Sequence, residues 1–184
     1  HDMKLVLLWF GSWKNGVSSY HPVWVKKDAA RFPSAQTKDG KTLPILSTLS
    51  TATAEADGKA YAAMMQHVKD VDANEQTVIM IQMENEVGLH GYTRDWCPAA
   101  NAALAGPVPQ QLMDYLVKHK DTLLPETLAA WKNGNFRTSG TWEEVFGRND
   151  RTDEIFMAWN YASYMNKVSA AGKAVYDLPT FVNA

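Results

Sequence analysis

Three polar residues, Glu84, Asn85 and Glu86, directly follow an apolar run and carry the groups in this chain best suited to chemistry. Carboxyl groups transfer protons or act as nucleophiles, and an amide binds hydroxyl groups. A carboxyl group can serve as a general acid at neutral pH when a partly desolvated setting raises its pKa. The triplet therefore predicts acid–base chemistry, although the same composition is typical of an ordinary cap or ion-pair cluster where a chain leaves a sheet.

The apolar run at residues 77–83 must position these groups. Because it lacks polar alternation, it is typical of a parallel strand that helices cover on both faces. Carboxylates are rarely buried without a partner, so Glu84 and Glu86 should emerge at the carboxyl end of the strand, where α/β barrels carry catalytic groups. A regular strand would point both to one side and Asn85 to the other, whereas a bulge would let all three fan around a pocket.

Aromatic residues near the first predicted strand are expected to wall this pocket, and they are Trp9, Trp13 and Trp24. Aromatic rings suit the apolar faces of pyranose sugars, while Asn, Lys and Glu suit sugar hydroxyls. Asn183, at the end of the last predicted strand, should face the same mouth and contact a ligand. The mixture favours a carbohydrate over a phosphate or a flat hydrophobic ligand.

Composition narrows the function classes. The chain has 184 residues, of which 46% are hydrophobic and 21% charged, as in a folded protein with a substantial core. A net charge of −2 gives no electrostatic footprint for nucleic acid or an anionic membrane, and no apolar run is long enough to span a bilayer. Cys97 is the single cysteine, so no intrachain disulfide is expected. The histidines do not show ligand spacing, so neither a metal nor an organic cofactor is implied.

The order of predicted elements indicates parallel strands joined by helical crossovers within one domain or part of one. The chain starts and finishes in predicted strands, so we expect it to be cut from something longer. Apolar stripes at helical spacing are expected to face the sheet, and they consist of Tyr61, Met64, Met65, Val68 and Val71 in one helix and Ile155, Trp159, Ala162, Met165 and Val168 in another. The predicted strands span 5–10, 77–86 and 180–182; an irregular or hairpin excursion spans 31–47; a short turn spans 141–146; and the predicted helices span 22–28, 53–72, 96–105, 109–119, 125–132 and 153–175.

The segment Gln-Met-Glu-Asn-Glu-Val-Gly at residues 82–88 resembles Gln-Val-Glu-Asn-Glu-Tyr-Gly of glycoside hydrolase family 35, the β-galactosidases built on (β/α)8 barrels. The strings Leu-Leu-Trp-Phe-Gly-Ser-Trp-Lys-Asn-Gly, Trp-Glu-Glu-Val-Phe-Gly and Pro-Thr-Phe-Val-Asn-Ala are similar to a bacterial branch of this family. The resemblance implies that Glu86 is the general acid/base and that Asn85 binds the sugar 2-hydroxyl. It also implies that residues 1–184 are a fragment of one catalytic TIM barrel domain, approximately strands three to five with their helices.

Two positions depart from the family pattern. Val87 replaces the usual Tyr after the acid/base, which leaves the chemistry intact. Asn15 stands where the family usually has a sugar-binding Glu, which weakens the expectation that galactose is the glycone. The loop residues Trp13, Lys14 and Asn15 are expected to bind substrate. Glu84 is assigned to the substrate site as a buried support, paired with a basic or hydroxyl group.

These expectations describe a retaining β-galactosidase-like hydrolase that acts on terminal β-linked sugars. Such an enzyme needs two carboxyl groups roughly 5–5.5 Å apart, and the resemblance implies that the nucleophilic Glu lies on strand seven, beyond the C-terminus of this chain. The remainder of the barrel would be required. The alternatives are a β-glycosidase of other sugar specificity and a non-catalytic carbohydrate-binding relative. By resemblance, the protein is expected to be secreted or periplasmic.

Overall fold

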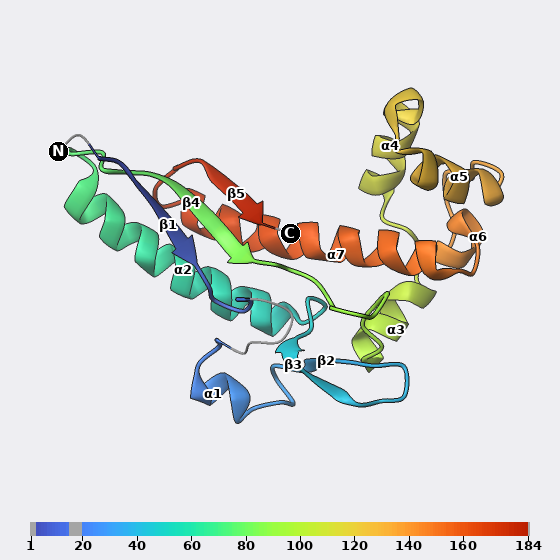
Figure 1. Cartoon of the computed structure of the whole chain (residues 1–184), viewed down its shortest axis with the longest axis horizontal. Helices are drawn as coiled ribbons and strands as arrows, with labels where there is room; N and C mark the ends of the chain where they lie inside the picture. The colour runs from blue at the N-terminus through green and yellow to red at the C-terminus, as the bar shows by residue number, and fades with distance from the viewer. Residues whose placement is uncertain (1–2, 15–19, 184) are drawn as a thin grey trace.

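The computed structural model describes residues 3–14 and 20–183 and has an α/β fold built on a three-stranded parallel sheet (Figure 1). The central strand β4 (Val78–Asn85) pairs on one side with β1 (Leu5–Trp9) and on the other with β5 (Thr180–Asn183). Both pairings are parallel, which confirms the predicted parallel sheet. Because the strands run in one direction, their carboxyl ends meet at one edge, where β1 and β5 flank the end of β4.

The connections contain the helices and the hairpin that the sequence predicts. Thr141, predicted in a turn, instead caps a short helix, because its hydroxyl accepts the N–H of Glu144 while the Glu144 carboxylate accepts the N–H of Thr141. Between β1 and β4 lie α1 (Val23–Lys26), the antiparallel pair β2 (Ser34–Gln36) and β3 (Thr42–Leu46), and α2 (Thr51–Asp72). Between β4 and β5 lie α3 (Pro98–Ala105), α4 (Gln110–Lys118), the short 3-10 helix η1 (Lys120–Thr122), α5 (Pro125–Asn133), α6 (Trp142–Phe146) and α7 (Asp150–Lys173).

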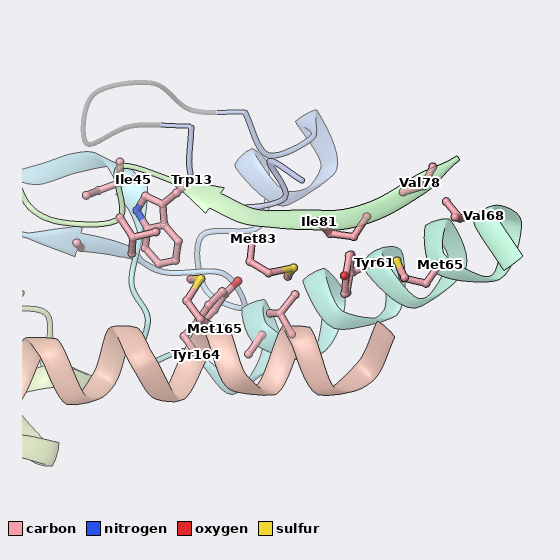
Figure 2. Packing of buried hydrophobic residues seen from close by; sticks show 14 residues of the cluster. Trp13, Ile45, Tyr61, Met65, Val68, Val78, Ile81, Met83, Tyr164 and Met165 are labelled. Carbon is pink, nitrogen blue, oxygen red and sulfur yellow. The ribbon is translucent and has the colours of Figure 1, made fainter. Parts of the chain in front are cut away.

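The long helices α2 and α7 pack against each other and against the same face of the sheet (Figures 1 and 2). Their close approach depends on Gly172, since a Cβ atom there would lie 2.1 Å from Cε1 of Tyr61. The core between helices and sheet is almost solvent-free and contains Trp13, Tyr61, Met65, Val68, Val78, Ile81, Met83, Tyr164, Met165 and Val168.

The opposite face of the sheet is open. Leu8, Gln82 and Phe181 are register partners across the three strands, so they share a face. On that face Leu8 and Phe181 of the outer strands are 53% and 39% exposed, and the central Gln82 is 8% exposed. The expectation that helices cover both faces is therefore wrong for the described residues, because both crossover helices pack onto one side.

Helix α7 joins two hydrophobic clusters. Its C-terminal half contributes Met165 and Val168 to the core under the sheet, while its N-terminal half contributes Phe156 and Met157 to a second cluster formed with α3–α6. The predicted single stripe fails at Ala162, which is exposed, because the two halves bury different faces. Among the described residues, no helix combines the length and apolarity that crossing a bilayer would require.

The stripe predicted for α2 is also wrong at its last member. Val71 is exposed, whereas the neighbouring Asp72 turns inward. Its carboxylate accepts the backbone N–H groups of Thr77 and Val78 at 3.1 and 2.7 Å. This polar contact connects the end of α2 to the first residues of β4 and thereby helps to set the position of the strand.

Candidate active site

The carboxyl end of β4 has an irregular backbone. Glu84 and Glu86 adopt positive φ angles of 55° and 48°, and the pairing of β4 with β5 shifts register between Gln82 and Asn85. Such angles cost of order 1–3 kcal/mol for a residue other than glycine and occur preferentially at functional sites. The distortion sends the two carboxylates into different surroundings: Glu84 is completely buried, and Glu86 is exposed.

Glu84 connects the end of β4 to the loop after β1. Its two carboxylate oxygens accept the backbone N–H groups of Ser12 and Trp13 at 2.8 and 2.6 Å. The predicted role as a buried support agrees with this geometry, but the partners are backbone amides and not a basic or hydroxyl side chain. Because the side chain has no exposed surface, it does not contact a ligand.

A second buried carboxylate, Asp57 of α2, lies next to Glu84 and completes this support. Asp57 accepts hydrogen bonds from the indole N–H of Trp9 and from the hydroxyls of Ser12 and Tyr164, each at 2.8 Å. Burial raises the pKa of Glu84 well above its usual value, and the neighbouring Asp57 carboxylate raises it further, while the two backbone N–H groups oppose the shift. The result is a sheltered acidic cluster directly beneath the strand end.

Sequence reasoning missed Asp57, Ser12 and Tyr164 as parts of the site. A usable signal was present at Asp57, because it precedes Tyr61 and Met65 at helical spacing and so places an acid on the core-facing side of α2. The structure also gives a reason for the glycine at position 11, since a Cβ atom there would lie 2.0 Å from Oδ1 of Asp57. The close approach of this loop to α2 therefore requires a glycine.

Asn85 is held by groups from β4, from β5 and from the loop after β1. Its amide nitrogen donates to the backbone carbonyl of Lys14 at 2.8 Å, and its amide oxygen accepts from Gln82 at 3.0 Å and from Asn183 at 2.9 Å. The backbone N–H of Asn85 also donates to the carbonyl of Trp13 at 3.3 Å. The amide plane is therefore fixed before any ligand arrives, which suits a group that orients a substrate hydroxyl.

Glu86 follows this fixed amide and remains open to solvent. It forms no hydrogen bond or ion pair with any other residue in the described part of the chain. A carboxyl group with free lone pairs beside an oriented amide can exchange a proton with a ligand bound over the strand end. The expected desolvating wall around Glu86 is not supplied by the described residues.

The prediction that tryptophans wall the pocket around Glu86 is wrong. Trp13, predicted to bind substrate, is 1% exposed and points into the core, where its ring centroid lies 5.1 Å from that of Tyr164 (Figure 2). Its backbone N–H donates to Glu84 and its carbonyl accepts from Asn85, whereas its indole lies in the core. Trp9 and Trp24 instead line a separate cavity of about 200 Å³ between β1, α1 and α2, and neither Asn85 nor Glu86 lines that cavity.

The remaining predicted residues gather around Asn85 to different degrees. Asn183 lies beside it and donates to its amide oxygen. Lys14 contributes its carbonyl, while its ammonium group lies 5.6 Å from the ring centroid of Phe10. Asn15 lies outside the described residues. Within residues 3–14 and 20–183, no three His, Cys, Asp or Glu side chains are arranged to hold a metal ion.

Comparison with known proteins adds a fold similarity. No family model matches the chain, and no curated protein matches it. Among solved structures, it is similar to the polyextremophilic β-galactosidase from the Antarctic haloarchaeon Halorubrum lacusprofundi, with a TM-score of 0.58 and 16% identity over 98% of this chain and 26% of that chain. A β-galactosidase from Bacillus circulans sp. alkalophilus gives a TM-score of 0.49 and 16% identity over 88% of this chain and 25% of that one. The chain thus spans about a quarter of these proteins and shares its fold with part of the haloarchaeal enzyme.

Proposed function

We propose that this chain is part of the catalytic domain of a retaining β-galactosidase-like glycoside hydrolase of family 35, with Glu86 as general acid/base. The observation that carries the proposal is the pairing of an oriented amide, Asn85, with an open carboxyl group, Glu86, at the carboxyl edge of a parallel sheet. Parallel α/β enzymes bind their ligands at this edge. The fold shared with part of a β-galactosidase supports the same reaction class.

The arrangement of helices supports a barrel. In a doubly wound sheet helices cover both faces, whereas in a (β/α)8 barrel all helices lie outside and the inner face packs against other strands. Here α2 and α7 share one face, and apolar side chains such as Leu8 and Phe181 are exposed on the other. We therefore propose that residues 1–184 form one section of such a barrel, with the remaining strands covering this open face.

In the proposed mechanism, Glu86 donates a proton to the glycosidic oxygen as the bond to the leaving group breaks. A nucleophilic carboxylate attacks the anomeric carbon from the opposite side, and Glu86 then removes a proton from the water that releases the sugar. Asn85 binds the sugar hydroxyl next to the anomeric centre. The complete burial of Glu84 supports a nucleophile other than Glu84.

The test is the dependence of hydrolysis on the leaving group. In the full-length protein, Glu86→Gln should reduce kcat/KM on aryl β-galactosides with poor leaving groups by about 10²–10⁴-fold, and should have much less effect on dinitrophenyl β-galactoside, which needs little protonation. Glu75→Gln is a matched control, because Glu75 is an exposed carboxylate in the turn before β4. Equal activity of the wild type and Glu86→Gln on the poor leaving groups would refute the assignment.

The glycone requires a separate measurement. Asn15, in place of a sugar-binding Glu, is the position that bears on galactose specificity. Comparing kcat/KM for 4-nitrophenyl β-galactoside, β-glucoside and α-arabinoside should rank the galactoside first. A higher value for another glycoside would reassign the glycone while leaving Glu86 in its role, and binding without hydrolysis of any of them would indicate a non-catalytic relative.

A further inference from the structure

A second cleft, with a volume of about 510 Å³, lies beyond the strand end. It is lined by the turn of the β2–β3 hairpin with Lys38, the loop at residues 91–96 after β4, α3 with Leu104, α6 with Glu143, and residues 148–153 at the start of α7. None of these residues belongs to the cluster around Asn85 and Glu86. The cleft is therefore a separate feature that the proposed chemistry does not use.

The walls of the cleft are connected by buried polar contacts. Arg94 is 5% exposed, and its Nε lies 3.2 Å from a carboxylate oxygen of Asp153. The Thr93 hydroxyl donates to the other oxygen of Asp153 at 3.2 Å, so the loop is attached to the first turn of α7. The hairpin is attached to the same loop, because the Trp96 N–H donates to the carbonyl of Gln36 at 2.9 Å. Such a framework forms the cleft before a ligand arrives, which reduces the cost of ordering on binding.

The lining favours a neutral ligand rich in hydroxyl groups. Positive charges from Lys38, Arg94 and Arg148 are balanced by Glu143, Asp150 and Asp153, so the cleft does not concentrate an anion or a cation. The side chain of Asp150 is exposed and forms no hydrogen bond or ion pair with any residue of the described ranges, so its carboxylate oxygens are available as acceptors. Tyr92, 45% exposed, adds an aromatic surface of the kind that packs against a sugar ring.

The cleft lies at the same end of the fold as Glu86. Helix α7 runs back along the strands before β5 begins, so its first turn lies toward the carboxyl end of β4 (Figure 1). Tyr92 follows Glu86 by six positions in the sequence, which places their Cα atoms at most about 22 Å apart. A turn in which the Tyr92 N–H donates to the carbonyl of Leu89 shortens this path. An oligosaccharide of a few sugar units can therefore occupy both places at once.

We propose that this cleft binds the leaving-group side of a neutral β-linked hexose oligosaccharide, with Tyr92 as the surface for a sugar ring and Asp150 as a hydroxyl acceptor. The inference rests on the proposed function, because the general acid must contact the glycosidic oxygen and the loop that follows it borders the departing sugar. It adds a preference for oligosaccharides over single glycosides. The cleft thereby sets substrate length, separately from the chemistry at Glu86.

The test compares two substrates in the full-length protein. Tyr92→Ala should lower the ratio of kcat/KM for β-1,4-galactotetraose to that for 4-nitrophenyl β-galactoside roughly tenfold, as expected for loss of one well-placed aromatic contact. Tyr115→Ala is the matched control, since Tyr115 is an exposed tyrosine on α4 outside the cleft, and it should leave the ratio unchanged. A ratio for Tyr92→Ala within twofold of the wild type would overturn the proposal.

Binding measurements separate this proposal from the catalytic one. Calorimetric titrations with β-1,4-galactotetraose and cellotetraose should give a roughly tenfold weaker Kd for Glu86→Gln/Tyr92→Ala than for Glu86→Gln, for at least one of the two sugars. Where the wild type hydrolyses no glycoside, the same comparison between wild type and Tyr92→Ala keeps the cleft testable after the catalytic role has failed. Equal Kd values for both sugars, or no binding of either, would overturn the proposed cleft.

Discussion

Two carboxylates that are two residues apart at the end of β4 belong to different regions of this molecule. Glu84 lies in the buried region beneath the strand end, where Ser12, Trp13 and Asp57 surround it. Glu86 lies in the open region above, beside the fixed amide of Asn85. The bulged backbone between them separates a group that shapes the site from a group that is free to react. Two glutamates close together in the sequence thus have opposite surroundings, and the proposed chemistry needs only the exposed one.

The largest expected difference between the regions is in stability. Glu84→Ala leaves two buried backbone N–H groups without acceptors and should lower the free energy of unfolding of the full-length protein by about 3 kcal/mol. Glu86→Ala removes an exposed side chain that forms no hydrogen bond or ion pair with the described residues, and it should change this free energy by less than about 0.5 kcal/mol. Urea unfolding of both variants checks this contrast, and equal losses would show that the two regions do not differ as described.

Packing in the buried region gives the next largest effect. Gly11→Ala places a Cβ atom 2.0 Å from Oδ1 of Asp57 and 2.7 Å from Nε1 of Trp9. Relieving this overlap should destabilise the protein by about 2 kcal/mol. Gly88→Ala is the control in the open region, because a Cβ atom there meets nothing within 4 Å. Thermal midpoints that fall equally for the two variants would contradict the close approach of the loop to α2.

The raised pKa of Glu84 predicts a pH dependence. Its pKa in the folded state lies above that of the unfolded chain, so between the two values the folded state holds the proton more tightly. The contribution of Glu84 is complete below pH 4.5 and is lost as the pH rises through the folded-state pKa. In Asp57→Asn the neighbouring negative charge is absent, so the decline should be shallower. Urea unfolding from pH 4 to 8 gives the slope of the unfolding free energy against pH for the wild type and for Asp57→Asn. Identical slopes would show that Asp57 does not contribute to the raised pKa of Glu84.

The smallest effect is expected where the open region is supported from β5. Asn183→Ala removes one exposed hydrogen bond to the amide oxygen of Asn85, leaving the bonds from Gln82 and to Lys14. If the less well oriented Asn85 amide stabilises the transition state by about 1 kcal/mol less, kcat/KM on aryl β-galactosides should fall about fivefold. Asn133→Ala, at the end of α5, is the control. An unchanged kcat/KM for Asn183→Ala would show that Asn85 does not need this partner.

Local signals in the sequence predicted most of the elements. Helices α3 and α5 begin at Pro98 and Pro125, and α2 begins after the capping Ser50, so their starts are encoded by residues at the boundary itself. The parallel sheet followed from uninterrupted apolar runs. The prediction that helices cover both faces of these strands was wrong, because periodicity does not indicate on which side of a sheet a distant helix will pack. Val71 and Ala162 were misplaced for the same reason.

The candidate site was predicted in position but not in detail. The cluster at the end of β4 and its contact with Asn183 follow from parallel strands ending at one edge. The burial of Trp13 was not predictable, because the sequence of a glycine-containing loop does not indicate whether a tryptophan ring faces a pocket or the core. The separation of Glu84 from Glu86 depends on positive φ angles that neither residue type indicates. Asp57 was missed because it lies on a distant helix.

The most direct measurement of the central claim is the reaction of Glu86→Gln with azide. Without its acid/base, the proposed glycosyl-enzyme intermediate from dinitrophenyl β-galactoside should form but react slowly with water. Azide, which needs no general base, should restore turnover and give β-galactosyl azide with retained configuration, identifiable by NMR. Rescue by azide in Glu86→Gln and not in Glu75→Gln is the predicted result. A wild-type kcat of Glu86→Gln on dinitrophenyl β-galactoside without azide, or no β-galactosyl azide with it, would contradict the role of Glu86.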